Sequence, residues 1–250
     1  MNEKAVDLSF SRVQAYLRCP WLYHLVYDLG WRSGPSAGMA LGQSVHRTLG
    51  RFLAADNSER TQDRLFEIFD EEWVNEGFES PEATLAAYES ARAMLHRFFE
   101  GEKSLFADVV ATEKDFDIPF GDELRFRGTL DRLDRHSDGT YEIVEYKTRV
   151  EGWTPERTDA DLQMTFYALG MKTVLQGAPV RLRYHFLSNG ESRVVERSAA
   201  QLSDAERILR DVGQKLGEKD FTPDHRYCVR CEFARRCAHY RPSKDAGVVQ

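Results

Sequence analysis

The chain has 250 residues, of which 42% are hydrophobic and 30% charged, and its formal net charge is −7. No apolar run reaches the roughly 20 residues that a membrane span needs, which argues against a membrane protein, and the first residues lack the apolar segment of a secretory signal. We therefore expect a cytoplasmic protein without a wholly basic surface, although a local basic track beside an acidic metal site would still suit nucleic acid.

Helices are predicted over the first hundred residues. Ser9 is a favourable N-cap for a helix over residues 11–29, which Gly30 would end. Apolar residues at helical spacing predict three more helices, over residues 39–54, 61–77 and 81–99.

After residue 101 the pattern changes to strands. Turn residues and alternating apolar residues predict strands, helices and a frayed end in this order: strands 111–120, 123–134 and 141–147, helix 159–176, strands 180–187 and 193–197, helix 203–216, and a tail over residues 243–250. Helices followed by strands that alternate with helices indicate an α/β fold.

A tight hairpin is predicted between the second and third of these strands. Residues 137–139 form a three-residue loop that ends on Gly139, where the left-handed backbone conformation favours glycine. Alternation of side chains then places Lys147 on the same face as Asp131 and Glu145. The loop fixes the register, which pairs His136 with Thr140, Leu133 with Ile143, and Asp131 with Glu145.

The Cβ atoms of directly opposed residues lie about 5 Å apart, so two carboxylates in that position would repel each other. A bound Mg²⁺ or Mn²⁺ offsets this repulsion, since both ions prefer oxygen ligands. Lys147 beside Asp131 and Glu145 could orient water or stabilise charge on a phosphate, which is chemistry for phosphodiester hydrolysis. The alternative is three charges on a solvated sheet face; Leu133 and Ile143 on the same face indicate instead that it is covered.

Four motifs give the chain a family resemblance. Residues 128–134 match G-x-x-D-R-x-D, residues 145–147 match (D/E)-x-K, residues 42–46 end on a histidine, and residues 163–167 match Q-x-x-x-Y. Together they resemble the RecB-like branch of the PD-(D/E)xK nuclease superfamily. The resemblance implies a restriction-endonuclease-like core with a central mixed sheet flanked by helices, a helical N-terminal region and a C-terminal cysteine cradle.

The resemblance also implies roles for individual residues. The metal ligands would be His46, Asp131, Glu145 and the backbone carbonyl of Tyr146. Lys147 would be the catalytic lysine, with Gln163 and Tyr167 supporting the site and the DNA. From the residues alone, a single helical histidine and an i, i+4 pair such as Gln163 and Tyr167 could equally be packing residues. We interpret Glu113 as a charged strand end and Asp134 as structural.

The four cysteines form a second constellation, because Cys228, Cys231 and Cys237 are clustered and Cys19 lies near the other end of the chain. Four thiolates suit either Zn²⁺ or an iron-sulfur cluster, and the flanking His225 and His239 keep zinc open. The layout resembles that of AddB-type nuclease domains and CRISPR-adaptation nucleases, which implies a [4Fe-4S] cluster.

The resemblance implies a metal-dependent deoxyribonuclease, with exonuclease action on single-stranded DNA or DNA ends in repair, recombination or end processing. Arginines such as Arg51 and Arg132 occur beside the motifs together with aromatic residues, a mixture that suits single strands. No P-loop motif is present, so a helicase or a recombination or CRISPR-adaptation protein would be a separate partner. The alternative is a DNA-binding or assembly subunit with little turnover of its own. We expect one nuclease domain over residues 1–242, made of a helical layer (1–100), a core (101–216) and a cluster-binding segment (217–242).

Overall fold

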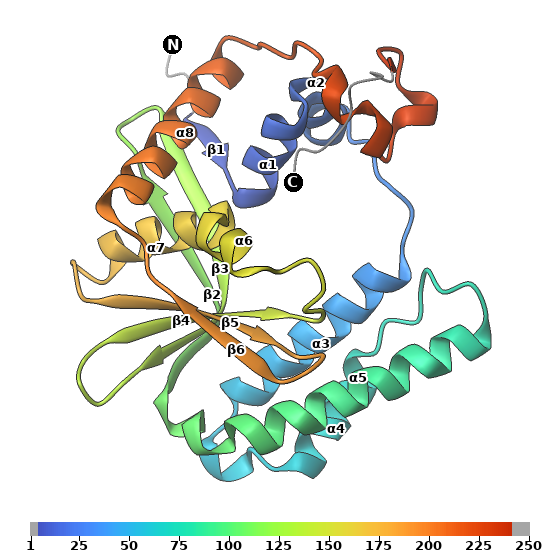
Figure 1. The fold of residues 1–250 in the computed structure, drawn as a ribbon, viewed down its shortest axis with the longest axis vertical. Coiled ribbons are helices and arrows are strands. Elements are labelled where there is room, and N and C mark those ends of the chain that lie inside the picture. The colour runs from blue at the N-terminus through green and yellow to red at the C-terminus, as the bar shows by residue number, and fades with distance from the viewer. Residues whose placement is uncertain (1–4, 242–250) are drawn as a thin grey trace. The chain divides into compact units, whose positions relative to one another are not determined.

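A computed structural model describes residues 5–241, and the tail predicted over residues 243–250 lies outside them (Figure 1). The chain folds into two compact units. Two units can belong to one domain, so the single domain over residues 1–242 stays a prediction. The first unit comprises the described parts of Met1–Gly34, Asp117–Arg127 and Ser203–Gln250, and the second comprises Pro35–Phe116 and Gly128–Leu202.

The second unit is built on the mixed sheet expected from the sequence. Strand β4 runs antiparallel to β3 and parallel to β5, and β6 is antiparallel to β5; β2 also pairs with β3. The strands are β2 (Val109–Pro119), β3 (Leu124–Arg135), β4 (Tyr141–Lys147), β5 (Val180–Phe186) and β6 (Glu191–Val195), with β2 and β3 shared between the units.

The predicted hairpin between β3 and β4 is confirmed. Gly139 has a φ of +84°, in the left-handed region that glycine adopts without strain. The His136 N–H donates to the Thr140 carbonyl at 2.9 Å. Leu133 pairs with Ile143 in the antiparallel ladder. The loop therefore sets the register that brings the two acidic motifs together.

Helices cover both faces of this sheet. On one face α3, α4 and α5 pack together (Figure 1). Their apolar side chains form one core with Val144 and Tyr146 of β4. On the other face, α7 packs against β4 and β5. The helices and 3₁₀ turns of this unit are α3 (Ala37–Ala54), η2 (Asn57–Glu59), α4 (Gln62–Glu72), α5 (Pro81–Glu102), η3 (Lys103–Asp108), α6 (Pro155–Ala160) and α7 (Leu162–Val174).

The helix predicted over residues 159–176 is two helices. They are separated at Asp161, whose backbone is extended with φ −68° and ψ 119°. The Asp161 side chain accepts a hydrogen bond from the Met164 N–H at 3.3 Å and so caps the start of α7. This cap fixes where α7 begins, and with it the positions of Gln163 and Tyr167.

A buried ion network lies on the sheet face that α5 covers. Glu102, at the end of α5, accepts hydrogen bonds from Arg132 at 2.8 Å and from Arg183 at 2.7 and 3.1 Å. Arg132 also donates to Asp134 at 2.6 Å, and Arg183 donates to Glu142 at 2.8 Å. Both arginines are buried, Arg132 completely. The structural role predicted for Asp134 is thus confirmed, and Arg132 is a core residue that faces no DNA.

The first unit brings together segments from both ends of the chain. Strand β1 pairs in parallel with residues 124–126 of β3, a pairing that sequence reasoning missed. The Tyr16 hydroxyl donates to the Asp220 carbonyl at 2.7 Å. The elements are β1 (Val6–Leu8), α1 (Phe10–Arg18), α2 (Pro20–Tyr23), the π-helix η1 (His24–Asp28), α8 (Ala199–Gly217), η4 (His225–Arg230) and η5 (Ala234–Arg236).

The helix predicted over residues 11–29 is interrupted at Cys19. Cys19 has an extended backbone, with φ −166° and ψ 118°, because the ring of Pro20 disfavours a helical conformation in the residue before it. The N-cap at Ser9 is confirmed, since its hydroxyl accepts from the Arg12 N–H at 3.4 Å. The break places Cys19 between two helices. None of the helices within residues 5–241 has the length and apolarity needed to cross a membrane.

Candidate active site and cysteine pocket

Six side chains from the predicted motifs lie together in the second unit, joined by hydrogen bonds. Two helices and two strands supply them: His46 lies on α3, Asp131 on β3, Glu145 and Lys147 on β4, and Gln163 and Tyr167 on α7. Segments far apart in the sequence therefore meet at the edge of one hairpin.

Asp131 lies just beyond the end of the regular β3–β4 ladder, whose last pair is Arg132 with Val144. One carboxylate oxygen of Asp131 accepts from the backbone N–H of Tyr146 at 2.9 Å, and the other lies 3.0 Å from Nδ1 of His46. The predicted ladder pair of Asp131 and Glu145 is thus absent from the described ladder. The hydrogen bond from the Tyr146 amide to the Asp131 carboxylate holds Asp131 against β4 instead.

Glu145 is the centre of the second half of the site. Its Oε1 accepts from Lys147 Nζ at 2.8 Å and from Gln163 Nε2 at 2.9 Å. Lys147 Nζ also donates to Gln163 Oε1 at 3.1 Å, and the Gln163 amide donates to the Tyr167 hydroxyl at 3.2 Å. Gln163 and Tyr167 are therefore polar partners of the acidic group rather than a packing pair alone. The side chain of Glu145 is only 6% exposed and that of Lys147 17%.

The pKa values of Glu145, Lys147 and His46 are all raised, each by a different balance of burial and neighbouring charge. Burial and the neighbouring Asp131 carboxylate raise the pKa of Glu145 to about 7, against the opposing effect of Lys147. Burial alone would lower the pKa of Lys147, but Glu145 outweighs it and the pKa is raised. His46 behaves in the same way, with Asp131 as the partner that raises its pKa. The site therefore tends to hold protons that a divalent ion would displace.

A pH dependence of stability follows for the protein stripped of metal. The pKa of Glu145 is about 7 in the folded protein, against an ordinary value of 4.5. Between these values the folded state binds more protons than the unfolded state, so the free energy of unfolding falls as pH rises. Urea denaturation in EDTA at pH 5 and pH 8 should show a larger loss for the wild type than for Glu145→Gln. Equal losses in the two proteins would contradict the burial of this carboxyl group.

Glu113 is a residue whose place sequence reasoning missed, since we interpreted it as a charged strand end. Its φ is +44°, an unusual backbone conformation for a residue other than glycine. Burial and the nearby Asp131 raise its pKa, while His46 opposes the shift. Its side chain fits against Gly50 of α3, where an added Cβ would lie 2.6 Å from Glu113 Cγ. A glycine inside a predicted helix indicates that another group packs closely there, so Gly50 was the one feature of the sequence that pointed to this contact.

The oxygen and nitrogen atoms around Asp131 and Glu145 are ligands that suit a hard divalent ion. Within residues 5–241, no three His, Cys, Asp or Glu side chains are arranged to hold a metal directly. In this arrangement the Asp131 and Glu145 oxygens take hydrogen bonds from His46, Lys147 and the Tyr146 amide instead. Two carboxylates with an imidazole and a carbonyl nevertheless form a donor set that fits Mg²⁺ or Mn²⁺. Metal binding would exchange hydrogen bonds for ligation.

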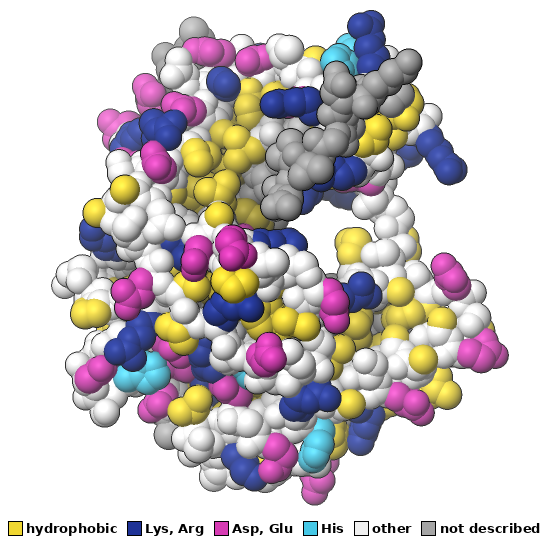
Figure 2. All heavy atoms as spheres, in the orientation of Figure 1, with side chains coloured by type: hydrophobic (Ala, Val, Ile, Leu, Met, Phe, Trp, Pro, Cys, Tyr) yellow, Lys and Arg dark blue, Asp and Glu magenta, His cyan; other side chains and the backbone are white. Residues whose placement is uncertain are grey.

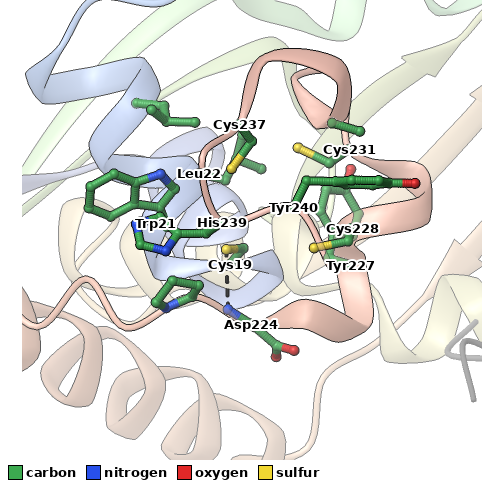
Figure 3. Close-up of a pocket in the computed structure, with 13 residues that line it drawn as sticks. Cys19, Trp21, Leu22, Asp224, Tyr227, Cys228, Cys231, Cys237, His239 and Tyr240 are labelled. Atoms are coloured by element: carbon green, nitrogen blue, oxygen red, sulfur yellow. Dashed lines mark hydrogen bonds between the residues drawn. The ribbon is translucent and has the colours of Figure 1, made fainter. Parts of the chain in front are cut away.

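The four cysteines border one pocket within the first unit (Figure 3). All four are free thiols, and the Cys19 sulfur accepts from the Asp224 N–H at 3.3 Å. Burial raises the pKa of Cys231, and the nearby Cys237 and Cys19 add to the shift. His239 also lines the pocket, and His225 Nδ1 lies 3.8 Å from the Cys228 sulfur. Four thiols around one pocket fit the donor chemistry of an iron-sulfur cluster or of zinc.

Aromatic and apolar side chains support this pocket. Leu22 and Leu25 from the N-terminal segment are buried with Phe233 from the C-terminal segment. Trp31, which packs on Phe233 with ring centroids 5.5 Å apart, lies beneath the guanidinium of Arg236 at 4.9 Å. The two ends of the chain are therefore joined by apolar contacts as well as by the hydrogen bond from the Asp224 N–H to the Cys19 sulfur.

Acidic and basic side chains of the described residues are intermingled on the face drawn in Figure 2. Arg51, named from the sequence as a candidate DNA contact, forms ion pairs with Glu71 at 2.7 Å and Glu72 at 2.5 Å. Arg132 is buried. Two of the arginines named from the sequence as evidence for binding single-stranded DNA therefore have other partners in the fold.

Comparison with known proteins identifies the family. The family model of the PD-(D/E)XK nuclease superfamily matches residues 7–238. A solved structure described as the crystal structure of SSO0001 is 14% identical, with a TM-score of 0.38 over 91% of this chain and 94% of that chain. No curated protein is similar enough in sequence to match. Since the family model spans most of the sequence, the chain belongs to the PD-(D/E)XK nuclease superfamily.

Proposed function

We propose that the protein is a metal-dependent deoxyribonuclease of the RecB-like branch, which hydrolyses phosphodiester bonds in single-stranded DNA or at DNA ends during repair, recombination or end processing. The main support is the hydrogen-bonded group formed by Glu145, Lys147 and Gln163 beside Asp131. Such a group combines carboxylates for a divalent ion with a cation for a phosphate.

His46, Asp131, Glu145 and the carbonyl of Tyr146 would hold Mg²⁺ or Mn²⁺. When bound, the ion supplies a Lewis acid that lowers the pKa of water and offsets phosphate charge. Lys147, held by Glu145 and Gln163, places an ammonium group where it orients the attacking water or stabilises negative charge on the phosphate. Tyr167 keeps the Gln163 amide in position through a hydrogen bond at 3.2 Å.

Digestion of labelled DNA in Mn²⁺ tests this function and its substrate. We expect linear single strands to be shortened from an end, linear duplexes to be degraded more slowly, and circular single strands to persist. Cleavage of the circle would replace the exonuclease with an endonuclease. DNA binding by wild type without any metal-dependent cleavage would instead favour a DNA-binding or assembly subunit.

We further propose that Cys19, Cys228, Cys231 and Cys237 bind a [4Fe-4S] cluster, which would supply structural cross-linking of the chain ends. The support is the four free thiols around one pocket and the packing of Cys19, Cys231 and Cys237 against an apolar cluster that contains Phe233. Zn²⁺ is the alternative, and a visible absorption spectrum of protein purified without oxygen separates the two.

Cys19→Ala should release the iron and lower the melting temperature by about 5–10 °C, since losing a few kcal/mol of cross-linking shifts a chain of this size by that amount. His239→Ala is the matched control because His239 lines the same pocket but is outside the four-thiol set. Iron analysis and calorimetry measure both effects. Full iron content in Cys19→Ala, or iron loss in His239→Ala alone, would disprove the four-cysteine assignment.

A further inference from the structure

The indole ring of Trp153 lies beside the lysine of the candidate active site. Lys147 Nζ is 4.8 Å from the centroid of the Trp153 ring, and the guanidinium carbon of Arg157 is 4.2 Å from it. Trp153 is half-buried and follows β4 in the loop that leads to α6. None of the four family motifs includes it, and its contact with Lys147 is visible only in the folded chain.

Trp153 is held in place by contacts that do not depend on Lys147. Its backbone N–H donates to the Val150 carbonyl at 3.0 Å, and Arg193 donates to its backbone carbonyl at 2.8 Å. The ring packs against Tyr184 of β5, with centroids 5.4 Å apart. Tyr184 pairs with Glu145 across β4 and β5, so it lies on the active-site face of the sheet. Trp153 is therefore a preformed wall of this site.

An ammonium group over an indole face is attracted by the electron-rich ring, most strongly where water is excluded. Lys147 is 17% exposed, so its ammonium is largely shielded. Its other partners are the oxygens of Glu145 and Gln163, and Glu145 is a proposed metal ligand. A carboxylate that shares its charge with a divalent ion attracts an ammonium less, whereas the indole ring does not ligate that ion.

We propose that Trp153 is a positioning residue for Lys147, whose ring face holds the ammonium in place during phosphodiester hydrolysis. The inference rests on the proposed nuclease function and adds a residue to it. Trp153 acts through Lys147, so its loss should lower kcat and leave KM for DNA unchanged. A ring that stacked on a DNA base would have the opposite effect, raising KM.

Fluorinated tryptophans inserted at position 153 alone test this role. Each added fluorine weakens the negative face of the ring while nearly keeping its shape, so log kcat should fall steadily with the number of fluorines. Across the series we expect a fall of about three- to tenfold, with unchanged KM and melting temperature. Trp153→Leu should lower kcat at least as much. Fluorination in the Lys147→Ala background should change nothing further.

The control is the cation and ring pair of Arg92 and Phe66, in which the guanidinium carbon is 4.0 Å from the ring centroid. Phe66→Leu should leave kcat unchanged per folded molecule. Equal kcat across the fluorinated series, or a rise in KM instead, would overturn the inference while the nuclease function stands. Absence of Mn²⁺-dependent cleavage by the wild type would overturn the nuclease function and the inference with it.

Discussion

Lys147→Ala should lower the rate of DNA cleavage by about two to three orders of magnitude, the usual cost of removing a group that stabilises charge in a transition state. The fold should survive, because Gln163 keeps its own hydrogen bond to Glu145 at 2.9 Å when the ammonium is gone. The measurement is single-turnover cleavage of labelled DNA in Mn²⁺, with DNA binding and melting temperature recorded beside it.

Lys172→Ala is the matched control for this variant. Lys172 is an exposed lysine in the last turn of α7, in the same unit as Lys147. Its replacement should leave cleavage within about twofold of the wild type, since exposed charges far from a site contribute little. If Lys147→Ala cleaved DNA as fast as Lys172→Ala, Lys147 would not be the catalytic lysine.

Arg183→Met should lower the free energy of unfolding by about 3–5 kcal/mol, because it removes a positive partner from a buried ion network and leaves its carboxylates in place. Arg183 is 5% exposed and donates to Glu102 and Glu142, and its Nη2 lies 3.6 Å from Asp134. Its removal leaves these buried carboxylates with Arg132 as their one remaining arginine partner at hydrogen-bond distance among the described residues. Urea denaturation at pH 7 measures the effect.

Arg64→Met makes the same chemical change at an exposed ion pair and is the control. Arg64 lies 2.9 Å from Glu67, with side chains 43% and 63% exposed. Such a pair contributes about 0–1 kcal/mol, because water screens both charges. A loss in Arg183→Met no larger than that in Arg64→Met would mean that the network is not needed for folding.

The ion network lies directly behind the candidate active site, on the opposite face of the same strands. Arg132 follows Asp131 directly, and Tyr146 lies between Glu145 and Lys147, so side chains of the two faces alternate along the same strands. Arg132 is held by Glu102 and Asp134 at 2.8 and 2.6 Å. Fixing Arg132 fixes the backbone that presents Asp131.

Local chemistry made part of this structure predictable. The loop ending at Gly139 fixed the hairpin register because a left-handed glycine admits few loop geometries, and this register aligned the two acidic motifs. The spacing of Gln163 and Tyr167 placed both on one face of a helix, where they are hydrogen-bonded to each other. These features depend on residues close in sequence, so the sequence alone predicts them.

Features that depend on tertiary contacts were not predictable in this way. Glu102 joins the ion network from the end of a helix, about thirty residues before Arg132, and no pattern links the two. The wrong prediction of a continuous helix over residues 11–29 has a local cause, since Pro20 signals a break that the apolar periodicity around it obscured. Strand β1 is only three residues long, too short for alternation to be recognised.

Calorimetric titration with Mn²⁺ most directly tests the claim that Asp131 and Glu145 form a metal-binding catalytic centre. The wild type should take up the ion, and Asp131→Asn combined with Glu145→Gln should abolish that uptake. The control combines Asp63→Asn with Glu67→Gln on exposed residues of α4, and it should bind as the wild type does. Undiminished manganese uptake by the Asp131 and Glu145 double variant would contradict the claim.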